Sequence, residues 1–439
     1  MDTIKISKKR INLGDARLEQ ATIKDYGKTI NVHGDTGGAD IDIDLETGNV
    51  HSATISTDAV TFTFSNPPAS GTAGSFTLVL TNGGSQDIFW PAAVNWPSGT
   101  APSLSATGVD MLTFITPDAG TTWYGAVAIS GAQLTLQSTY GYFVGGQTGT
   151  SAVATADRIT YATGITAAHT ASNLPAAKGY FGGLSDRVTY GYFGGGYAGS
   201  PVATTNRLTF STGAVAANAA SDLSVARYFA AHHSDGSTYG YFSGGVGASA
   251  LTDRIVFSTS VTSSNTASNL IEPRYGAAGL SDGSTYGYTL GGFSVTNKSN
   301  VDRLTYSTST SAAQTASVLS SSRFLTRAVS DASLYGYILG GSTDGGSTTV
   351  TTTDRIVFST STISAHTAAN LEVVQQSMAA SSDGTAYGYV AGGNSAGTTA
   401  SVVATAHRIT FSTGETAANA ASNLSQARTH AGGVSDSSV

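Results

Sequence analysis

The chain contains no cysteine, which excludes disulfide bonds, thiolate metal sites and thiol nucleophiles and leaves the redox compartment open. Charged residues are scarce, at 11% of 439 residues, and the net charge is −7. Residues 1–139 hold 7 Lys and Arg against 13 Asp and Glu, and residues 140–439 hold 14 against 15. Neither part is basic, so we expect no binding to nucleic acid.

Long hydrophobic runs are also missing. No apolar stretch approaches the roughly 20 residues that a membrane span needs, and residues 1–20 lack the apolar core of a signal peptide. We therefore expect no membrane insertion. Methionine is rare, with 3 residues, whereas glycine numbers 53. Together with abundant Ser, Thr and Ala, this composition is typical of short strands and many turns.

The most informative feature is an internal repeat with four markers, each present six times. Tyr-Gly-Tyr, followed by a Gly-Gly pair, begins at Tyr140, Tyr190, Tyr239, Tyr286, Tyr335 and Tyr387. The second marker is Asp157-Arg158, Asn206-Arg207, Asp253-Arg254, Asp302-Arg303, Asp354-Arg355 and His407-Arg408. The third is Lys178, Arg227, Arg274, Arg323, Gln375 and Arg428, and the fourth is Ser-Asp, with its aspartate at 186, 235, 282, 331, 383 and 436.

The spacing between these markers predicts a closed ring. Marker two lies 21 residues before marker three, and marker three lies 8 residues before the Ser-Asp aspartate, in all six copies. Each repeat has four strand-like stretches in roughly 50 residues, the size of a propeller blade. The first copy starts at its second strand, and the last stops after a first strand, Arg428–Val434. We therefore predict a six-bladed β-propeller over residues 140–439, with this strand innermost in the blade that Tyr140 begins.

The repeat resembles the kelch family of propellers. The matching segments are Arg227–Ala231, Tyr239–Gly245, Ile255–Thr259 and Asn269–Leu270, and the resemblance covers about 300 residues. The tryptophan that kelch repeats carry on their outer strand is absent from every copy. The resemblance therefore implies a divergent kelch-like ring, and no site residue of the family carries over to this chain.

The N-terminal region gives a second all-β prediction. Val60–Phe64, Phe76–Leu80 and Met111–Ile115 alternate with period two, and the chain's three Trp lie between residues 90 and 123. We predict an antiparallel β-sandwich or small jelly roll at residues 25–131, after an attachment segment at 1–24 and before a linker at 132–139. A short helix is expected near Asp15–Lys24.

This region also resembles a domain of bacteriophage tail fibres and related virion proteins. The residues that carry the resemblance are Val60–Gly84, Trp90–Pro102 and Val109–Gly125. It implies a virion fibre subunit that is attached to tail, baseplate or neck proteins through its N-terminal part and displays the propeller outward. Because fibres are commonly threefold, it also implies a homotrimer held through residues 1–131, with Trp90, Trp96 and Trp123 either in that contact or in the core of one subunit.

Residues that recur in every blade are interpreted as architectural. We expect the repeated acids and arginines to form structural ion-pair or turn networks; they are Asp157, Arg158, Arg207, Asp253, Arg254, Asp302, Arg303, Asp354, Arg355 and Arg408. The slot of His169 and His366 holds Asn or Gln in the other repeats, so it needs a hydrogen-bonding group rather than a metal ligand. We predict no metal, no cofactor and no enzymatic activity.

Only the loops between Gly-Gly and marker two vary in length. They span residues 147–156, 197–205, 246–252, 293–301, 342–353 and 394–406. A rigid scaffold with variable loops favours recognition at those loops, although unconstrained loops would vary in the same way. The candidate ligand residues are Tyr197, Phe293, Asn297, Lys298, Asn300, Asp344 and Asn394. The functional hypothesis is binding of a host-surface glycan; the alternatives are a purely structural virion protein and, less favoured, a polysaccharide depolymerase.

Overall fold

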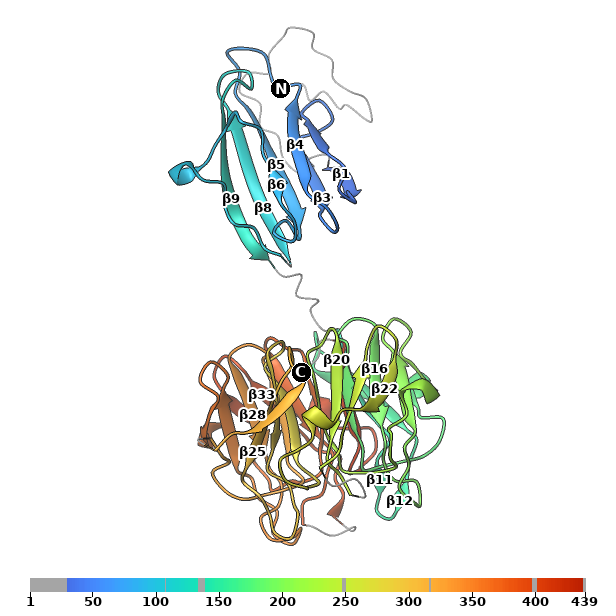
Figure 1. Ribbon diagram of the computed structural model, residues 1–439. Coiled ribbons are helices and arrows are strands. Elements are labelled where there is room, and N and C mark those ends of the chain that lie inside the picture. The colour runs from blue at the N-terminus through green and yellow to red at the C-terminus, as the bar shows by residue number, and fades with distance from the viewer. Residues whose placement is uncertain are drawn as a thin grey trace, which may run out of the picture. The chain divides into compact units, whose positions relative to one another are not determined.

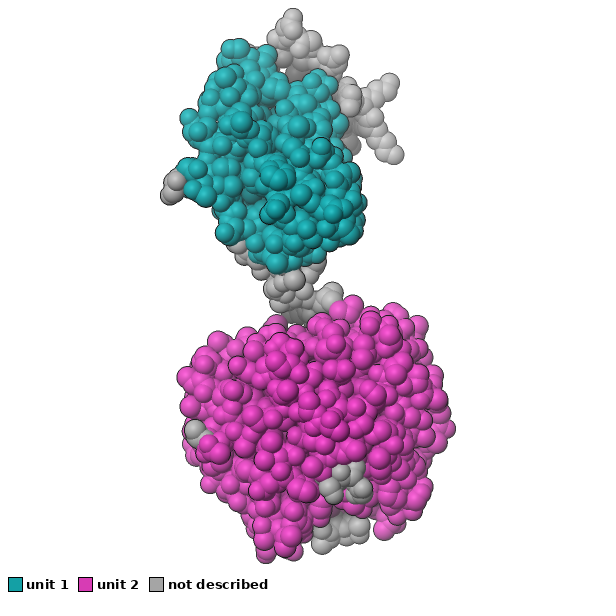
Figure 2. Space-filling model, viewed as in Figure 1, with its two compact units in different colours: residues 1–135 teal, residues 136–439 magenta. Residues whose placement is uncertain are grey.

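The computed structural model describes residues 30–106, 108–132, 139–246, 250–315, 317–396 and 401–436. The chain divides into two units, residues 1–135 and 136–439 (Figure 2). The expected attachment segment with its short helix, and residues 133–138 of the expected linker, lie outside the described residues. Within the described part of the chain, no helix has both the length and the apolarity to cross a membrane.

The first unit is built from two β-sheets. One has the strand order β1 (Ile30–Asp35), β3 (Val50–Thr54), β5 (Gly74–Thr81), β8 (Val109–Thr116), β9 (Trp123–Ala132) and β7 (Val94–Asn95). The other has the order β2 (Ile41–Asp44), β4 (Val60–Ser65) and β6 (Ile88–Phe89), and a 3₁₀ turn, η1, covers Pro97–Gly99. Figure 1 shows these strands in blue and cyan.

The strand directions differ from the antiparallel sandwich or jelly roll that the sequence predicted. From β1 to β6 the chain passes from one sheet to the other at every connection. Strands β1, β3 and β5 are therefore parallel to one another, as are β2, β4 and β6. Among the described strands of this unit, β5, β8 and β9 alone form antiparallel pairs. The prediction was wrong here because period-two alternation identifies a half-buried strand but carries no information about the direction of its neighbour.

The core of the first unit is aromatic. The ring of Phe76 stacks on that of Phe114, with centroids 4.7 Å apart, and Phe64 packs edge-on against both. Trp123 is buried, and Trp90 and Trp96 are partly buried against the same cluster. All three tryptophans pack in or against the core of this unit, which is one of the two places predicted for them.

The second unit consists, within the described residues, of six four-stranded antiparallel sheets arranged as the blades of a propeller (Figure 1). From the axis outward, blade 1 is β35 (Gly432–Ser435), β10 (Tyr140–Val144), β13 (Ala156–Thr160) and β14 (Ile165–Ala168). Blade 2 is β15 (Gly182–Ser185), β16 (Tyr190–Gly194), β17 (Thr205–Thr209) and β18 (Ala214–Ala217); blade 3 is β19 (Ala231–Ser234), β20 (Tyr239–Ser243), β21 (Thr252–Val256) and β22 (Val261–Ser264). Blade 4 is β23 (Ala278–Ser281), β24 (Tyr286–Leu290), β25 (Val301–Thr305) and β26 (Thr310–Ala313); blade 5 is β27 (Arg327–Ser330), β28 (Tyr335–Leu339), β29 (Thr353–Val357) and β30 (Thr362–Ala365). Blade 6 is β31 (Ala379–Ser382), β32 (Tyr387–Ala391), β33 (Ala406–Thr410) and β34 (Glu415–Ala418).

Short elements join the blades. A small hairpin, β11 (Gln147–Thr148) and β12 (Ser151–Ala152), lies in the first variable loop. Single 3₁₀ turns follow outer strands: η2 (Thr170–Ser172), η3 (Ala219–Ser221), η4 (Thr266–Ser268), η5 (Thr367–Ala369) and η7 (Ala420–Ser422). The Ser-Asp turns lie at one end of the strands, which we call the turn face. The variable loops lie at the other end, the loop face.

The predicted closure of the ring is confirmed. β35 pairs antiparallel with β10, with Gly141 opposite Ser435 and Val144 opposite Gly432, and the innermost strands contact one another around a complete cycle. Each innermost strand begins about four residues later than the sequence indicated. The residue two positions before the strand adopts a left-handed conformation, which regular strands do not contain. In blade 1 that residue is His430, with φ of 56°.

The left-handed residues form a closed ring of hydrogen bonds around the axis at the loop face. In each case the backbone N–H donates to the carbonyl of the equivalent residue in the preceding blade, at 2.8–2.9 Å. The six residues are Tyr180, Phe229, Gly276, Leu325, Ser377 and His430, with φ between 56° and 63°. We call this set the mouth ring.

A second set of bonds links the innermost strands at the turn face. The hydroxyls of five of the six Ser-Asp serines each donate to the backbone carbonyl of the equivalent serine one blade earlier, at 2.8–3.0 Å. The five donors are Ser185, Ser234, Ser281, Ser330 and Ser382. The innermost strands are therefore tied to their neighbours at both ends.

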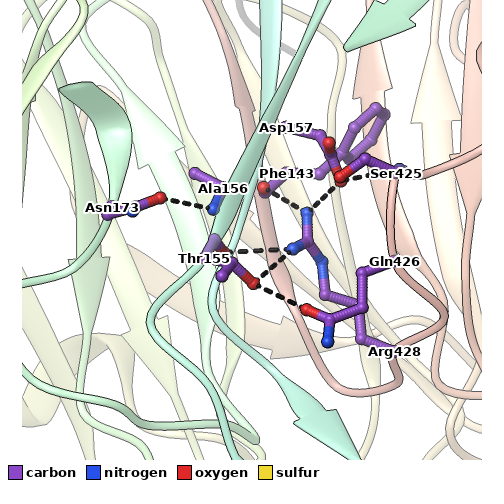
Figure 3. A network of polar contacts seen from close by, with 8 residues as sticks. All are labelled: Phe143, Thr155, Ala156, Asp157, Asn173, Ser425, Gln426 and Arg428. Atoms are coloured by element: carbon purple, nitrogen blue, oxygen red, sulfur yellow. Dashed lines mark hydrogen bonds and ion pairs between the residues drawn. The ribbon is translucent and has the colours of Figure 1, made fainter. Parts of the chain in front are cut away.

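A buried network fastens blade 1, where the two ends of the ring meet (Figure 3). Nη2 of Arg428 lies 2.6 Å from Oδ2 of Asp157, with both side chains completely buried. The same guanidinium donates to the carbonyls of Phe143, at 2.9 Å, and Thr155, at 3.1 Å. The backbone N–H of Ser425 donates to the Asp157 carboxylate. All the acceptors that Arg428 reaches lie near the start of the ring, 271–285 residues away in sequence.

Deletion of residues 428–439 should prevent the propeller from folding. The truncation removes the innermost strand of blade 1 and takes the arginine partner from the buried Asp157 carboxylate, and breaking a buried ion pair in this way costs about 3–5 kcal/mol on its own. Circular dichroism and thermal melting of the truncated chain would measure the effect. Deletion of residues 437–439 alone is the control, because it leaves every contact named above in place. A truncated chain that melts like wild type would contradict this account of closure.

Candidate binding surface

Six partly exposed aromatic residues form a continuous arc on the loop face. They are Tyr180, Tyr197, Tyr228, Phe229, Tyr275 and Phe293, which we call the aromatic arc. Successive rings are in contact, with centroids 4.9–6.0 Å apart. The arc runs over blades 2, 3 and 4, beside the mouth ring, to which Tyr180 and Phe229 also belong.

Local backbone pairing positions the arc. The residue after marker three pairs with the residue after the Gly-Gly pair of the same blade, as in Gly179 with Tyr197 and Tyr275 with Phe293. The second glycine of the pair makes this approach feasible: a Cβ at Gly196, which has φ of 117°, would lie 2.9 Å from the Gly179 carbonyl oxygen. Each variable loop thus starts beside the mouth, and its first residue stands next to an inner-strand residue.

Polar groups hold one end of the arc. The Tyr180 hydroxyl donates to Oε1 of Gln147 at 2.6 Å, and the Tyr180 ring packs against His430, with centroids 4.1 Å apart. Burial raises the pKa of Tyr180 and of Tyr275. Both hydroxyls are therefore neutral at physiological pH and can donate hydrogen bonds.

The other half of the loop face is polar and covered. The first residue of the variable loop is Tyr197 in blade 2 and Phe293 in blade 4. In blades 1, 5 and 6 the same position holds Gln147, Ser342 and Asn394, all of them buried. These three blades have the longest variable loops, with 10, 12 and 13 residues, whereas blades 2, 3 and 4 have 9, 7 and 9. The first loop residue is therefore buried and polar in the three blades with longer loops, whereas Tyr197, Val246 and Phe293 at the same position in the other three are partly exposed.

Two of the seven predicted ligand residues, Tyr197 and Phe293, lie in the aromatic arc. Asn297 donates to the carbonyl of Ser342 at 3.0 Å and so ties two loops together. Asn394 accepts bonds from its own loop, from the N–H of Ala396 and the hydroxyl of Ser401. These amides support loop structure.

The remaining three candidates are spread over two loops. Lys298 forms an ion pair with Glu272 at 3.3 Å. Asn300 is partly buried, and its side-chain oxygen is buried without a hydrogen bond. Asp344 is exposed in the loop of blade 5. The structure therefore does not gather the seven candidates into one site.

The sequence prediction missed Tyr180, Tyr228, Phe229 and Tyr275. A signal for them exists in the repeat. The two positions after marker three read Gly-Tyr, Tyr-Phe, Tyr-Gly, Phe-Leu, Gln-Ser and Thr-His in order. Tyr or Phe occurs there in four of the six copies, and this recurrence of aromatic residues next to the variable loops is the signal that could have found them.

The repeated charged residues have structural contacts in every blade. Arg227 pairs with Asp253 at 2.8 Å, Arg274 with Asp302 at 3.2 Å and Arg323 with Asp354 at 2.7 Å, all of them buried. The arginine of marker two lies over the first ring of Tyr-Gly-Tyr, 4.1–4.6 Å from its centroid. These arginines are Arg158, Arg207, Arg254, Arg303, Arg355 and Arg408.

In blades 2 and 6 both members of the Arg–Asp pair are replaced. Blade 2 has Lys178 with Asn206, and Nζ of Lys178 donates to three backbone carbonyls at 2.8–3.1 Å. Blade 6 has Gln375 with His407, and Nε2 of Gln375 donates to the Gly392 carbonyl at 2.6 Å. The carboxylate is absent wherever the arginine is absent, so neither blade buries an unpaired acid. Burial lowers the pKa of Lys178 to about 7.

The histidines hold hydrogen-bonding positions. Nδ1 of His169 lies 2.7 Å from the hydroxyl of Ser172, and Nε2 of His366 lies 3.1 Å from the carbonyl of Gly414. Burial lowers the pKa of both. In the residues that the structure describes, no group of three or more His, Asp or Glu side chains has the arrangement of a metal site.

The acids left over by the repeat have separate roles. Oδ1 of Asp222 accepts the N–H of Thr205 at 2.7 Å, the same bond that Asn173 and Asn269 make with Ala156 and Thr252. Glu372 accepts the N–H of Ala418 at 2.9 Å, and Glu272 pairs with Lys298. These contacts place the acids in blade architecture or in a surface ion pair, so they give no support to the pair of facing carboxylates that glycoside hydrolysis uses.

No protein-family model and no curated protein matches this chain. The description of the fold therefore rests on the structure alone: along the chain, a two-sheet β unit is followed by a β-propeller with six blades in the described residues.

Lys178 should make stability depend on pH. Its pKa is about 7 in the folded chain against an ordinary value of 10.5, so between these values the unfolded chain holds a proton that the folded chain has released. The free energy of unfolding should then rise with pH, by about 2 kcal/mol between pH 7.5 and 9. Denaturant unfolding of wild type and Lys178→Met, compared at each pH, isolates this contribution.

Lys298→Met is the matched control for Lys178→Met, because it removes a lysine that is partly exposed. The control should follow wild type across the pH range, whereas Lys178→Met should lack the rise. Parallel curves for wild type and Lys178→Met would contradict the lowered pKa of Lys178.

Proposed function

We propose that the propeller is a binding module for host-surface glycans in a bacteriophage virion fibre subunit. The aromatic arc is the observation that carries the binding function. One face of a sugar ring consists of C–H groups, which pack on aromatic faces, and its hydroxyls need hydrogen-bonding partners nearby. Six partly exposed rings with neutral tyrosine hydroxyls offer both.

The direction of the chain supports an outward-facing loop face. The backbone N–H groups of Thr139 and Tyr140 donate to the Asp436 carboxylate at 2.8–3.2 Å, so the chain enters the propeller at the turn face. The aromatic arc lies at the opposite end of the strands. A fibre subunit held through its N-terminal part presents its ligand surface well when that surface is remote from the entry point.

The virion assignment rests on the resemblance of residues 60–84, 90–102 and 109–125 to tail-fibre domains, and the kelch-like relationship rests on the repeat. On this proposal the protein lies at the particle surface, as part of a tail or neck fibre, with tail, baseplate or neck proteins as partners. The depolymerase hypothesis gains nothing from the acids described above. A purely structural role remains the alternative, and the binding experiment separates it from recognition.

Truncation of two aromatic side chains in the arc should weaken glycan binding. We expect Tyr197→Ala with Phe293→Ala to lower affinity about tenfold or more, because aromatic side chains dominate the energetics of binding surfaces. An array of bacterial surface oligosaccharides probed with the full chain would measure binding, and adsorption of particles carrying the variant would test it on the host. Circular dichroism would confirm that the variant is folded.

The matched control is Val188→Ala with Leu334→Ala. These residues are 61% and 60% exposed and lie in Ser-Asp turns, so the control removes apolar surface from the opposite face. It should bind like wild type. Equal binding by a folded arc variant, or no binding of any oligosaccharide by wild type, would favour the structural role.

The fibre proposal also makes the protein a homotrimer, held through residues 1–131. Light scattering of the full chain at micromolar concentration should then give about three times the chain mass of 44.4 kDa. The isolated propeller, residues 136–439, should be monomeric if the contact lies in the first unit. A monomer mass for the full chain would count against this assembly.

A further inference from the structure

One position beside the propeller axis breaks the pattern of the ring. Two residues after each mouth-ring residue, five blades carry glycine or alanine: Gly182, Ala231, Ala278, Ala379 and Gly432. Small residues are expected there, because the innermost strands crowd together near the axis. Blade 5 carries Arg327 at this position, and the arginine is partly exposed.

The guanidinium of Arg327 has few partners for its five N–H donors. Within the described residues it makes one hydrogen bond, from Nη1 to the Thr326 carbonyl at 3.1 Å. Its surroundings lower the pKa of Arg327 to about 10 through burial, with no carboxylate acting in the opposite direction. The four buried arginines of marker three, by contrast, each lie against an aspartate.

Two histidines lie close to this charge. Burial and the positive charge of Arg327 lower the pKa of His232 and of His430 to about 3. Nδ1 of each ring is buried without a hydrogen-bond partner. The three residues come from blades 1, 3 and 5, so they approach the axis from three alternate directions. The result is a guanidinium and two imidazoles grouped where no acid compensates them.

There is also space on the axis. A cavity of roughly 40 Å³ is lined by His232, by Ala328, the residue after Arg327, and by hydroxyl-bearing residues that include Ser382 and Ser435. Of the three residues only His232 lines it, so the cavity adjoins the group on one side. Carboxylate and phosphate oxygens match the donor geometry of a guanidinium, and charge-assisted hydrogen bonds are the stronger ones. A neutral imidazole can add an N–H donor.

We propose that Arg327, with His232 and His430, forms an oxyanion site on the propeller axis that takes a carboxylate or phosphate group. The group arrives either as a free anion or as a substituent of a sugar bound at the loop face. The second source rests on the proposed glycan function, and it would make the preferred glycan an acidic one.

The test is a titration of the full-length protein at constant ionic strength, followed by thermal melting. Acetate and phosphate probe the free anion, and D-glucuronate against D-glucose probes the same charge carried on a sugar. We expect saturable stabilisation by at least one anionic probe. Arg327→Ala, which installs the residue that three other blades carry, should weaken that binding about tenfold or more, as loss of a charge-assisted pair would. Arg327→Gln is a second variant that keeps more of the side-chain volume.

Arg187→Gly is the matched control. Arg187 stands in a Ser-Asp turn with φ of 70°, at a position where other blades carry glycine, and it donates to the Gly283 carbonyl. The variant therefore removes one arginine from the opposite end of the strands and should keep the anion response.

The outcomes separate the two sources and the two proposals. Stabilisation by acetate or phosphate that Arg327→Ala removes supports a free anion, and stabilisation by glucuronate alone supports an acidic sugar. No anion-specific stabilisation of wild type up to about 0.1 M, or an unchanged response in both Arg327 variants, overturns the site. Binding of neutral oligosaccharides by Arg327→Ala would leave the glycan function intact.

Discussion

The ring of hydrogen bonds at the loop face is the constraint on which the propeller's geometry depends. Each bond joins a left-handed residue to the equivalent residue one blade earlier, so none can form unless neighbouring blades are in place. Five bonds link blades that follow one another in the chain, and the sixth, from Tyr180 to His430, needs the C-terminal strand. The left-handed conformation is unfavourable for residues with a Cβ, and five of the six have one. Their side chains are held at the mouth at the cost of local strain.

Buried charge in the blades follows the same logic of complete pairing. Four blades bury an arginine with an aspartate and with backbone carbonyls, and such a pair stabilises little over an apolar replacement but is costly to break. Because loss of one member of the pair is costly, the blades that lack the arginine, blades 2 and 6, also lack the aspartate. Lys178 keeps three carbonyl acceptors but no carboxylate, and its lowered pKa reports the desolvation that the aspartates offset elsewhere. Arg327 is partly exposed and has one carbonyl acceptor and no carboxylate, and the proposed anion site rests on this difference.

Much of the propeller could be predicted because its repeat is periodic. Constant spacings gave the blade number, and the incomplete first and last copies gave the closing strand. The directions of β1 to β6 could not be predicted, because the alternation of apolar and polar residues along one strand does not indicate the direction of its neighbour. Two of the six residues of the aromatic arc were predicted, because Tyr197 and Phe293 stood out as aromatic residues in variable loops. Tyr228 and Tyr275 lie inside the repeat: pairing of inner strand with loop brings Tyr275 beside Phe293, and contact between neighbouring blades brings Tyr228 beside Tyr197.

The distribution of variation around the ring is the main argument for the proposed recognition surface over a purely structural role. Ion pairs, cation–π contacts and Ser-Asp turns recur almost unchanged around the ring, so the scaffold is close to sixfold. The mouth ring, its neighbours and the variable loops differ in every blade, and they differ coherently: short loops accompany exposed aromatic rings, and long loops accompany buried polar residues. A module that only packed against other chains through a symmetric ring would gain nothing from this asymmetry. A surface that discriminates one ligand from another requires it, because identical blades would present six identical weak sites.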